Sequence, residues 1–252
     1  MRRAPRGTGR LIALEGVDGC GKSTQARLLA QALGVPVTGE PGGTPVGRSL
    51  RTVLLDPALP EVSPRTEALL MAADRAEHVA RVLGPALEAG QWVVTDRYSG
   101  STLAYQGFGR GLDVGELEWL VSWAAGGLEA DLNVLVDVDL ALATERMAGR
   151  GDRPQPPAPA PASDRRPAGA AVPAAGSGRP RRPQVRAERL DRMDRLDDGF
   201  RRAVRQGFLA LADADPIRWV VVDGAGPVDQ VARAVRQAVT DRLGDPPGGW
   251  RR

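Results

Sequence analysis

The sequence of 252 residues contains one cysteine, one histidine and one lysine. With Cys20 alone, the chain cannot form an internal disulfide framework or a cysteine-rich zinc site. With His78 alone, it cannot build a multi-histidine metal site, and nucleophilic chemistry that needs a Ser–His or Cys–His pair is disfavoured. The other 33 of the 34 basic residues are arginine, so Lys22 marks a position at which arginine has not replaced lysine.

Long hydrophobic runs are also missing. The sequence has no stretch of about 18 apolar residues that could cross a membrane, and its N-terminus lacks the apolar core of a signal peptide. We therefore expect a cytoplasmic protein with no membrane partner. The hydrophobic fraction of 42% and the chain length suffice for one large domain or two small ones.

The formal net charge of +3 is unevenly distributed along the chain. Segments 1–10, 154–187 and 244–252 carry net charges of +4, +5 and +1, so the rest of the chain carries −7. We expect a disordered basic N-terminal tail at 1–10, a disordered Pro/Ala/Arg-rich insert at 154–187 and a C-terminal tail at 244–252. Because the remainder is acidic, a nucleic-acid partner is unlikely on charge grounds. The insert is interpreted either as an expansion without function or as a basic tether for nucleic acid or an acidic partner.

Short apolar segments alternate with helical patterns through the rest of the chain. Strands are predicted at 11–14, 35–38, 92–95, 132–137 and 217–222. Helices are predicted at 24–33, 45–55, 64–88, 99–106, 113–125, 139–149, 188–213 and 227–243. This alternation predicts an α/β fold, a doubly wound parallel sheet of five strands flanked by helices, in a single domain over 11–243.

The segment 16–23 reads GVDGCGKS, which satisfies the pattern G-x-x-x-x-G-K-[ST] between a predicted strand and a predicted helix. The glycines let consecutive backbone N–H groups surround phosphate oxygens, and the helix N-terminus adds its positive end. Lys22 would contact the β- and γ-phosphates of ATP, and the Ser23 hydroxyl would ligate Mg²⁺. The predicted ATP-binding loop consists of Gly16, Val17, Asp18, Gly19, Cys20, Gly21, Lys22, Ser23 and Thr24.

Four motifs in chain order resemble the thymidylate kinase family: EGVDGCGKST at 15–24, EPGGT at 40–44, ADRAEH at 73–78, and DRY with AYQG within 96–107. The resemblance covers 11–150 and resumes over 188–243. It implies a P-loop nucleoside-monophosphate-kinase-like fold and direct in-line transfer of the γ-phosphate of ATP to dTMP, giving dTDP. It also implies Mg²⁺ as cofactor and a homodimer, and it places the insert within the lid of the kinase domain.

Phosphoryl transfer between two anions requires cations that hold both reactants and neutralise the charge developing between them. Arg97 follows directly after a predicted strand, at the strand end where doubly wound folds bind ligands. The resemblance implies that Arg97 bridges the acceptor phosphate and the transferred group. It further implies that Asp96 acts on Mg²⁺ through water.

The same resemblance implies the contacts to dTMP. Asp18 would accept the sugar 3′-OH, Arg51 would contact the acceptor phosphate and Arg75 the base. Met71 stands where the family usually places a phenylalanine against the base, and it offers a polarizable apolar contact. Ser101 and Thr102 would bond the pyrimidine edge, and Tyr105 would pack at the 2′ position. The full expected set is Asp18, Arg51, Met71, Arg75, Arg97, Ser101, Thr102, Tyr105 and Gln106.

The family takes a catalytic arginine either from the phosphate loop or from the lid. Positions 17–20 contain no arginine, so the resemblance implies the lid-arginine type. The candidates on the two sides of the insert are Arg150, Arg153, Arg189 and Arg192. Arg192 is preferred because it leads without a gap into the next family-like helix, and Arg153 is second. The expected catalytic set is Lys22, Arg97, Arg192 and Arg153.

Two other functions stay open from the sequence. One is a kinase for another nucleotide or a deoxynucleoside, which the combined motifs at 40–44 and 96–107 disfavour. The other is a catalytically impaired nucleotide-binding paralogue. The intact set of Lys22, Ser23, Asp96 and Arg97 disfavours that second alternative.

Overall fold

The structure, a computed structural model, describes residues 8–56, 58–60, 62–149 and 197–251. The predicted insert at 154–187 and the four candidate lid arginines (Arg150, Arg153, Arg189 and Arg192) lie outside the described residues. No helix in the described part of the chain is long and apolar enough to cross a membrane.

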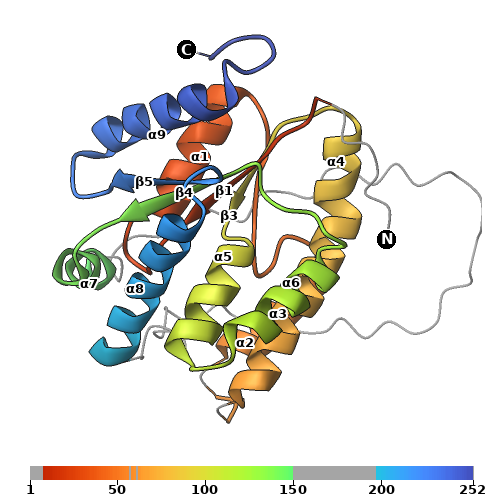
Figure 1. The fold of residues 1–252 in the computed structure, drawn as a ribbon, viewed down its shortest axis with the longest axis vertical. Coiled ribbons are helices and arrows are strands. Elements are labelled where there is room, and N and C mark those ends of the chain that lie inside the picture. Colours follow the sequence, from red (N-terminus) through yellow and green to blue (C-terminus); the bar gives the residue numbers. More distant parts are fainter. Residues whose placement is uncertain (1–7, 57, 61, 150–196, 252) are drawn as a thin grey trace, which may run out of the picture.

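The described residues form one parallel sheet of five strands in the order β2-β3-β1-β4-β5 (Figure 1). The strands are β1 Leu11–Glu15, β2 Val37–Gly39, β3 Val93–Asp96, β4 Leu132–Asp137 and β5 Trp219–Asp223. In the register, Leu11 lies opposite Val93 and Ile12 opposite Leu132. This confirms the predicted doubly wound α/β sheet of five strands. The strands after β1 lie on both sides of it, so the carboxyl end of β1 borders the crevice in which such folds bind ligands.

Alternate residues of β1 belong to two hydrophobic clusters. Ile12 and Leu14 pack with Ala26 and Leu29 of α1, whereas Leu11 packs with Leu83 in a second cluster. Because successive strand residues point to opposite faces, helices cover both faces of the sheet. The α-helices are α1 Lys22–Leu33, α2 Pro45–Leu55, α3 Pro64–His78, α4 Gly84–Glu88, α5 Ser99–Thr102, α6 Val114–Ala124, α7 Leu140–Ala148, α8 Asp198–Ala214 and α9 Val228–Leu243.

The helix predicted over 64–88 is continuous but contains a π-helical segment, η1 Val79–Leu83, between α3 and α4. The N–H of Gly84 donates to the carbonyl of Val79, five residues back. Pro85 follows directly; it has no N–H, and its ring clashes with the carbonyl four residues earlier in a regular helix, so the wider turn accommodates it. A second π-helical segment, η2 Leu103–Gly109, directly follows α5.

Both terminal segments contact the domain in the parts that the structure describes. Arg10 forms an ion pair with Asp131 at 3.3 Å. At the other end, the N–H of Arg251 donates to the carbonyl of Ala32 at 2.7 Å, and Trp250 packs against the core. Burial of apolar indole surface and these polar contacts attach residues 8–10 and 244–251 to the domain.

Candidate active site

The loop between β1 and α1 can form only with glycines. Gly16 and Gly19 have φ values of 140° and 87°, which side chains disfavour. A Cβ at Gly16 would lie 2.6 Å from the carbonyl oxygen of Val136, and one at Gly19 would lie 2.2 Å from that of Ala143. In the described chain no side chain caps α1 and its first turn holds no acidic residue, so the positive end of this helix is open to an anion.

Lys22 lies inside this loop with its side chain only 7% exposed. Its Nζ donates to the carbonyl of Val17 and to Oδ1 of Asp18, both at 3.3 Å. The ammonium group is therefore enclosed by loop oxygens on a scale that suits a compact point charge.

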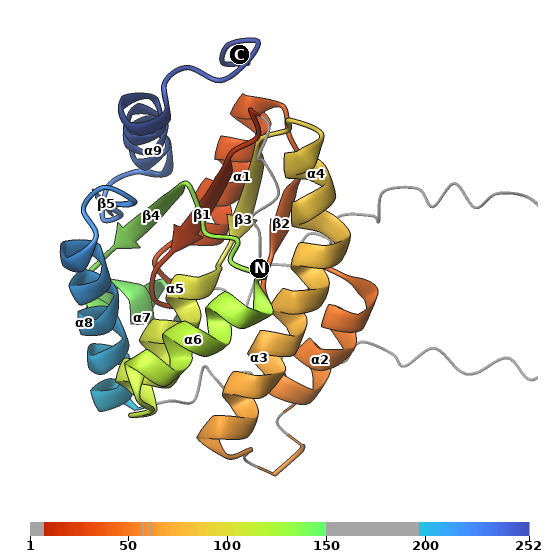
Figure 2. The ribbon, with the colours of Figure 1, turned by 45° about the vertical axis from the view of Figure 1, so that its right-hand side comes forward.

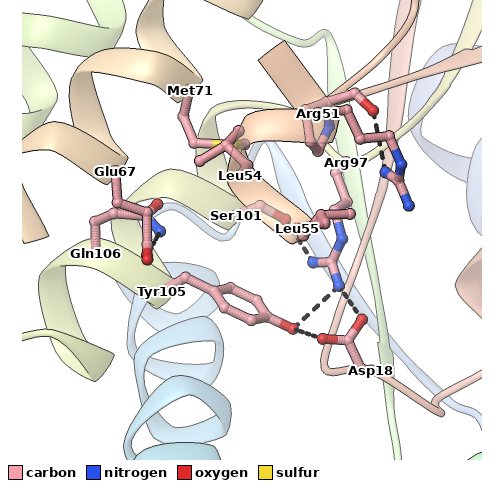
Figure 3. Close-up of a pocket in the computed structure, with 11 residues that line it drawn as sticks. Asp18, Arg51, Leu54, Leu55, Glu67, Met71, Arg97, Ser101, Tyr105 and Gln106 are labelled. Atoms are coloured by element: carbon pink, nitrogen blue, oxygen red, sulfur yellow. Dashed lines mark hydrogen bonds and ion pairs between the residues drawn. The ribbon is translucent and has the colours of Figure 1, made fainter. Parts of the chain in front are cut away.

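Arg97 links the phosphate loop to the loop that follows β3. Its Nη1 donates to the carbonyl of Gly16 at 3.3 Å and to Oγ of Ser101 at 2.9 Å. Its Nη2 donates to the carboxylate of Asp18 and to the hydroxyl of Tyr105, the latter at 3.0 Å (Figure 3). Arg97 has a φ of 73°, a left-handed conformation uncommon for a residue with a side chain. This backbone conformation aims the guanidinium back at the phosphate loop.

Asp18 is the anion between the two cations. It accepts hydrogen bonds from Lys22 and Arg97, and its Oδ2 accepts from the hydroxyl of Tyr105 at 2.8 Å. Burial alone would raise the pKa of Asp18, but the charges of Arg97 and Lys22 hold it well below its usual range. Asp18 is therefore ionised throughout the physiological pH range.

A pocket opens beside this cluster, and seven of the nine residues predicted to contact dTMP line it (Figure 3). They are Asp18, Arg51, Met71, Arg97, Ser101, Tyr105 and Gln106. The other lining residues are Pro41, Leu54, Leu55 and Glu67. Two predicted contact residues, Arg75 and Thr102, are fully buried and are not among those that line the pocket.

Glu67 sets the orientation of Gln106. Its Oε1 lies 2.7 Å from Nε2 of Gln106, and its Oε2 lies 3.0 Å from Nη2 of Arg110. Because an ionised carboxylate only accepts hydrogen bonds, the amide NH₂ of Gln106 must face it. The opposite atom, Oε1 of Gln106, is buried without a hydrogen-bond partner among the described residues.

Arg75 is fully buried in α3. Its Nη2 lies 2.8 Å from Glu40 and donates to the carbonyl of Tyr98 at 3.0 Å. Glu40 also pairs with Nδ1 of His78 at 2.9 Å, and Nε2 of His78 lies 2.7 Å from Oγ1 of Thr38. This network fastens the loop after β2 to α3, and it gives His78 a structural role.

The expected magnesium ligands, Ser23 and Asp96, lie in the first turn of α1 and at the end of β3. Oδ1 of Asp96 is buried without a hydrogen-bond partner among the described residues. Within those residues there is no cluster of three or more His, Cys, Asp or Glu side chains suited to a metal ion. One carboxylate and one hydroxyl fit Mg²⁺, which keeps several waters and binds substrate phosphates rather than a cage of protein ligands.

Two acidic residues of the site are absent from the sequence-based set, as are the apolar lining residues Pro41, Leu54 and Leu55. Glu67 lines the pocket, and Glu15 accepts hydrogen bonds from the loop that carries Arg97. The available signal for Glu15 was an acidic residue ending a buried apolar strand, where a charge needs partners. Glu67 lies in the first turn of α3, where acidic residues commonly stabilise the helix dipole. Its position in the sequence therefore gave no sign of a role in the pocket.

Comparison with known proteins gives a consistent result. The sequence model of the thymidylate kinase family matches residues 14–157. The chain is 42% identical over 239 residues to the thymidylate kinase of Deinococcus radiodurans, an alignment that covers 93% of this chain and 98% of that protein. It is 40% identical over 240 residues to that of a Geobacter species, covering 93% of each. The crystal structure of thymidylate kinase from Ehrlichia chaffeensis matches with a TM-score of 0.61 at 25% identity, covering 92% of this chain and 98% of that one.

We predict that Lys22→Arg lowers the rate of phosphoryl transfer from ATP by about a hundredfold or more, as Lys22→Ala does. The planar guanidinium keeps the charge but cannot take the place of the ammonium between Val17 and Asp18. Steady-state kinetics measure the effect, and circular dichroism checks that each variant is folded. Arg81→Ala, at a position 72% exposed on η1, is the control and should match the wild type. A Lys22→Arg variant with wild-type kcat would show that the loop does not use Lys22 in this way.

Proposed function

The chain belongs to the thymidylate kinase family, and on that premise we propose that it transfers the γ-phosphate of ATP directly to dTMP, giving dTDP. The observation that carries the proposal is the position of Arg97. One of its nitrogens donates to Gly16 in the phosphate loop, and the same guanidinium lines the acceptor pocket beside Asp18 and Tyr105. A single cation is thus in contact with both halves of the site.

This arrangement supports catalysis by positioning and electrostatics, without a covalent enzyme intermediate. Lys22 holds the β- and γ-phosphates at the N-terminus of α1. Arg97 bridges the acceptor phosphate and the transferred group, and Arg51 approaches the acceptor phosphate from α2. Asp18 keeps Lys22 and Arg97 oriented and accepts the sugar 3′-OH, while Tyr105 packs at the 2′ position.

Magnesium is part of the proposal. Ser23 would ligate the ion, and Asp96, whose buried Oδ1 has no partner among the described residues, would act on it through water. When bound, Mg²⁺ neutralises charge on the phosphates during transfer. The chain's own residues provide the two oxygen groups and the helix N-terminus that orient the phosphate chain.

The pocket supports recognition of a pyrimidine that carries an N–H donor. Because Glu67 fixes the amide of Gln106, the carbonyl Oε1 of Gln106 is the atom left to accept a hydrogen bond. Thymine offers N3–H to such an acceptor, whereas cytosine presents an acceptor at N3 and leaves Oε1 buried and unpaired. Met71, Leu54 and Leu55 provide apolar contact for the ring.

The remaining catalytic cation is proposed to come from the lid, because the phosphate loop at 17–20 contains no arginine. Arg192 is the first candidate and Arg153 the second. Separate alanine substitutions, compared by kcat, decide between them.

We also propose a homodimer. Large apolar side chains are exposed on α2, α3 and α6, which lie side by side (Figure 2): they are Val46, Val53, Leu69, Trp119 and Trp123. The two tryptophans of α6 are 67% and 68% exposed and stack with ring centroids 6.1 Å apart. Burial of such a surface against a second copy supports the dimer, and the mass measured by light scattering tests it.

The function is tested by a coupled assay of ADP release with dTMP, dUMP, CMP, AMP and thymidine as acceptors. We predict a kcat/KM for dTMP at least about tenfold above that of dUMP, which lacks one methyl group, and far above the others. A clear preference for another acceptor would replace this function with that of a different kinase. Absence of turnover with all five would favour the catalytically impaired paralogue.

We predict that Glu67→Gln raises the KM for dTMP by about tenfold and narrows the preference for dTMP over CMP. The new amide can donate to Oε1 of Gln106, so the orientation of that side chain is no longer fixed. The KM for ATP should stay within about twofold, because the phosphate loop is untouched. Glu77→Gln, the same change on an outer face of α3, is the matched control. Unaltered acceptor preference in Glu67→Gln would show that Glu67 does not orient Gln106.

A further inference from the structure

Glu15 is a fully buried carboxylate at the carboxyl end of β1. Its Oε1 accepts the N–H groups of Tyr98 at 2.9 Å and Ser101 at 3.2 Å. Its Oε2 accepts the hydroxyl proton of Ser101 at 2.5 Å. Three donors from the segment that follows β3 thus converge on one carboxyl group that lies 83 and 86 positions away in the sequence.

These contacts lead directly to Arg97. Ser101 donates its proton to Glu15, so a lone pair of its Oγ is left for Nη1 of Arg97, which donates at 2.9 Å. The N–H of Arg97 is itself held by the carbonyl of Leu14, the neighbour of Glu15, at 2.9 Å. Both sides of the left-handed turn at Arg97 are therefore anchored to the last two residues of β1.

The surroundings leave Glu15 few other partners. Trp219 of β5 closes one side, because a Cβ at Gly100 would lie 2.5 Å from its ring and 3.0 Å from Oε1 of Glu15. The positive charge of Arg97 lowers the pKa of Glu15 and so opposes the effect of burial. Asp18 and Tyr105 hydrogen-bond Arg97. The hydroxyl of Tyr98 points away, to the carbonyl of Leu128 at 2.8 Å.

We propose that Glu15 is a positioning residue for phosphoryl transfer, whose ionised carboxylate holds the 97–101 segment so that Arg97 reaches both the phosphate loop and the acceptor pocket. This inference rests on the proposed transfer to dTMP. Glu15 does not line the pocket, so it acts through Ser101 and the backbone rather than on the substrate.

Protonation of Glu15 disrupts this arrangement. The other oxygen of Glu15 already accepts two backbone N–H groups, so the added proton belongs on the oxygen that faces Ser101. That oxygen would then donate to Ser101, whose hydroxyl loses its acceptor. Burial raises the pKa of Glu15 to about 7, despite the opposing hydrogen bond from Ser101 and the charge of Arg97. Turnover should therefore fall as the pH is lowered through neutrality.

The test compares the wild type with Glu15→Gln by the ratio of their kcat values for dTMP between pH 5.5 and 8.5. Ionisation of the substrate phosphates affects both enzymes alike and cancels in the ratio. We expect the ratio to be about tenfold or more at pH 8.5 and to fall toward one at pH 5.5, where the wild type is protonated and resembles the amide. Asp137→Asn is the matched control, an acid-to-amide change at the end of β4 where the carboxylate pairs with Arg205 at 2.7 Å; its ratio should be flat.

The change in Tm with pH separates a positioning role of Glu15 from a purely structural one, because the two roles predict opposite changes in the relative stability of Glu15→Gln. Because the pKa of Glu15 is raised from 4.5 to about 7 on folding, its contribution to stability is present below pH 4.5 and is lost as the pH rises through 7. The Tm of Glu15→Gln should therefore improve relative to the wild type from pH 5 to pH 8, while its relative activity falls. A structural stabiliser would show the variant losing stability and activity together.

If Glu15→Gln does not fold, Ser101→Ala tests the same link, because it removes the hydroxyl between Glu15 and Arg97. It should lower kcat and weaken the loss of activity at low pH. A flat ratio of wild type to variant across the pH range, in an enzyme active on dTMP, would overturn the role of Glu15 alone. Absence of wild-type activity on dTMP would instead overturn the proposed function.

Discussion

Arg97 and Asp18 lie 79 positions apart in the sequence, and their ion pair joins the phosphate loop to the segment after β3. The cation lies beside the two regions that we propose bind the phosphates: the N-terminus of α1 with Lys22, and the pocket lined by Ser101 and Tyr105. Asp18 keeps Lys22 and Arg97 close together, because its carboxylate compensates the positive charge of both. Phosphates that enter the site meet cations already in position, which is where electrostatic catalysis gains most.

Holding Arg97 there has a cost that the surrounding contacts offset. A side-chain-bearing residue at a φ of 73° is strained by on the order of 1 to 2 kcal/mol. The guanidinium is stabilised by hydrogen bonds to Gly16, Ser101 and Tyr105 and by the Tyr105 ring, whose centroid lies 4.8 Å away. The buried carboxylate of Glu15 holds the backbone of this turn through the N–H groups of Tyr98 and Ser101. Burial of that charge costs some of the protein's stability. The backbone strain therefore lies at the residue that we propose contacts both substrates.

Much of this molecule could be predicted from sequence because its signals are local. The strands are short apolar runs, and the phosphate loop is an eight-residue pattern. At α3, Ser63 is the N-cap and Pro64 is the first helical residue, which is a common pair at a helix start. The single lysine, Lys22, indicated the phosphate loop, since a compact ammonium fits there and a guanidinium does not.

What could not be predicted depends on contacts between distant positions. Glu15 and Glu67 obtain their roles from partners 86 and 39 residues away, and no spacing rule connects them. Arg75 is expected to contact the base, and no local pattern indicated that it would also be buried against Glu40 and the carbonyl of Tyr98. The packing of Trp250 on the core likewise arises from contacts between distant positions.

We propose that Arg97 acts on both substrate sites at once. Rapid-quench single-turnover kinetics of Arg97→Lys and the wild type, at saturating ATP, Mg²⁺ and dTMP, test this role most directly. The lysine keeps the charge but lacks the fork that reaches Gly16, Asp18 and Ser101 together. We expect a transfer rate lowered by about a hundredfold or more, with ATP affinity within about threefold of wild type. A transfer rate equal to that of the wild type would contradict it.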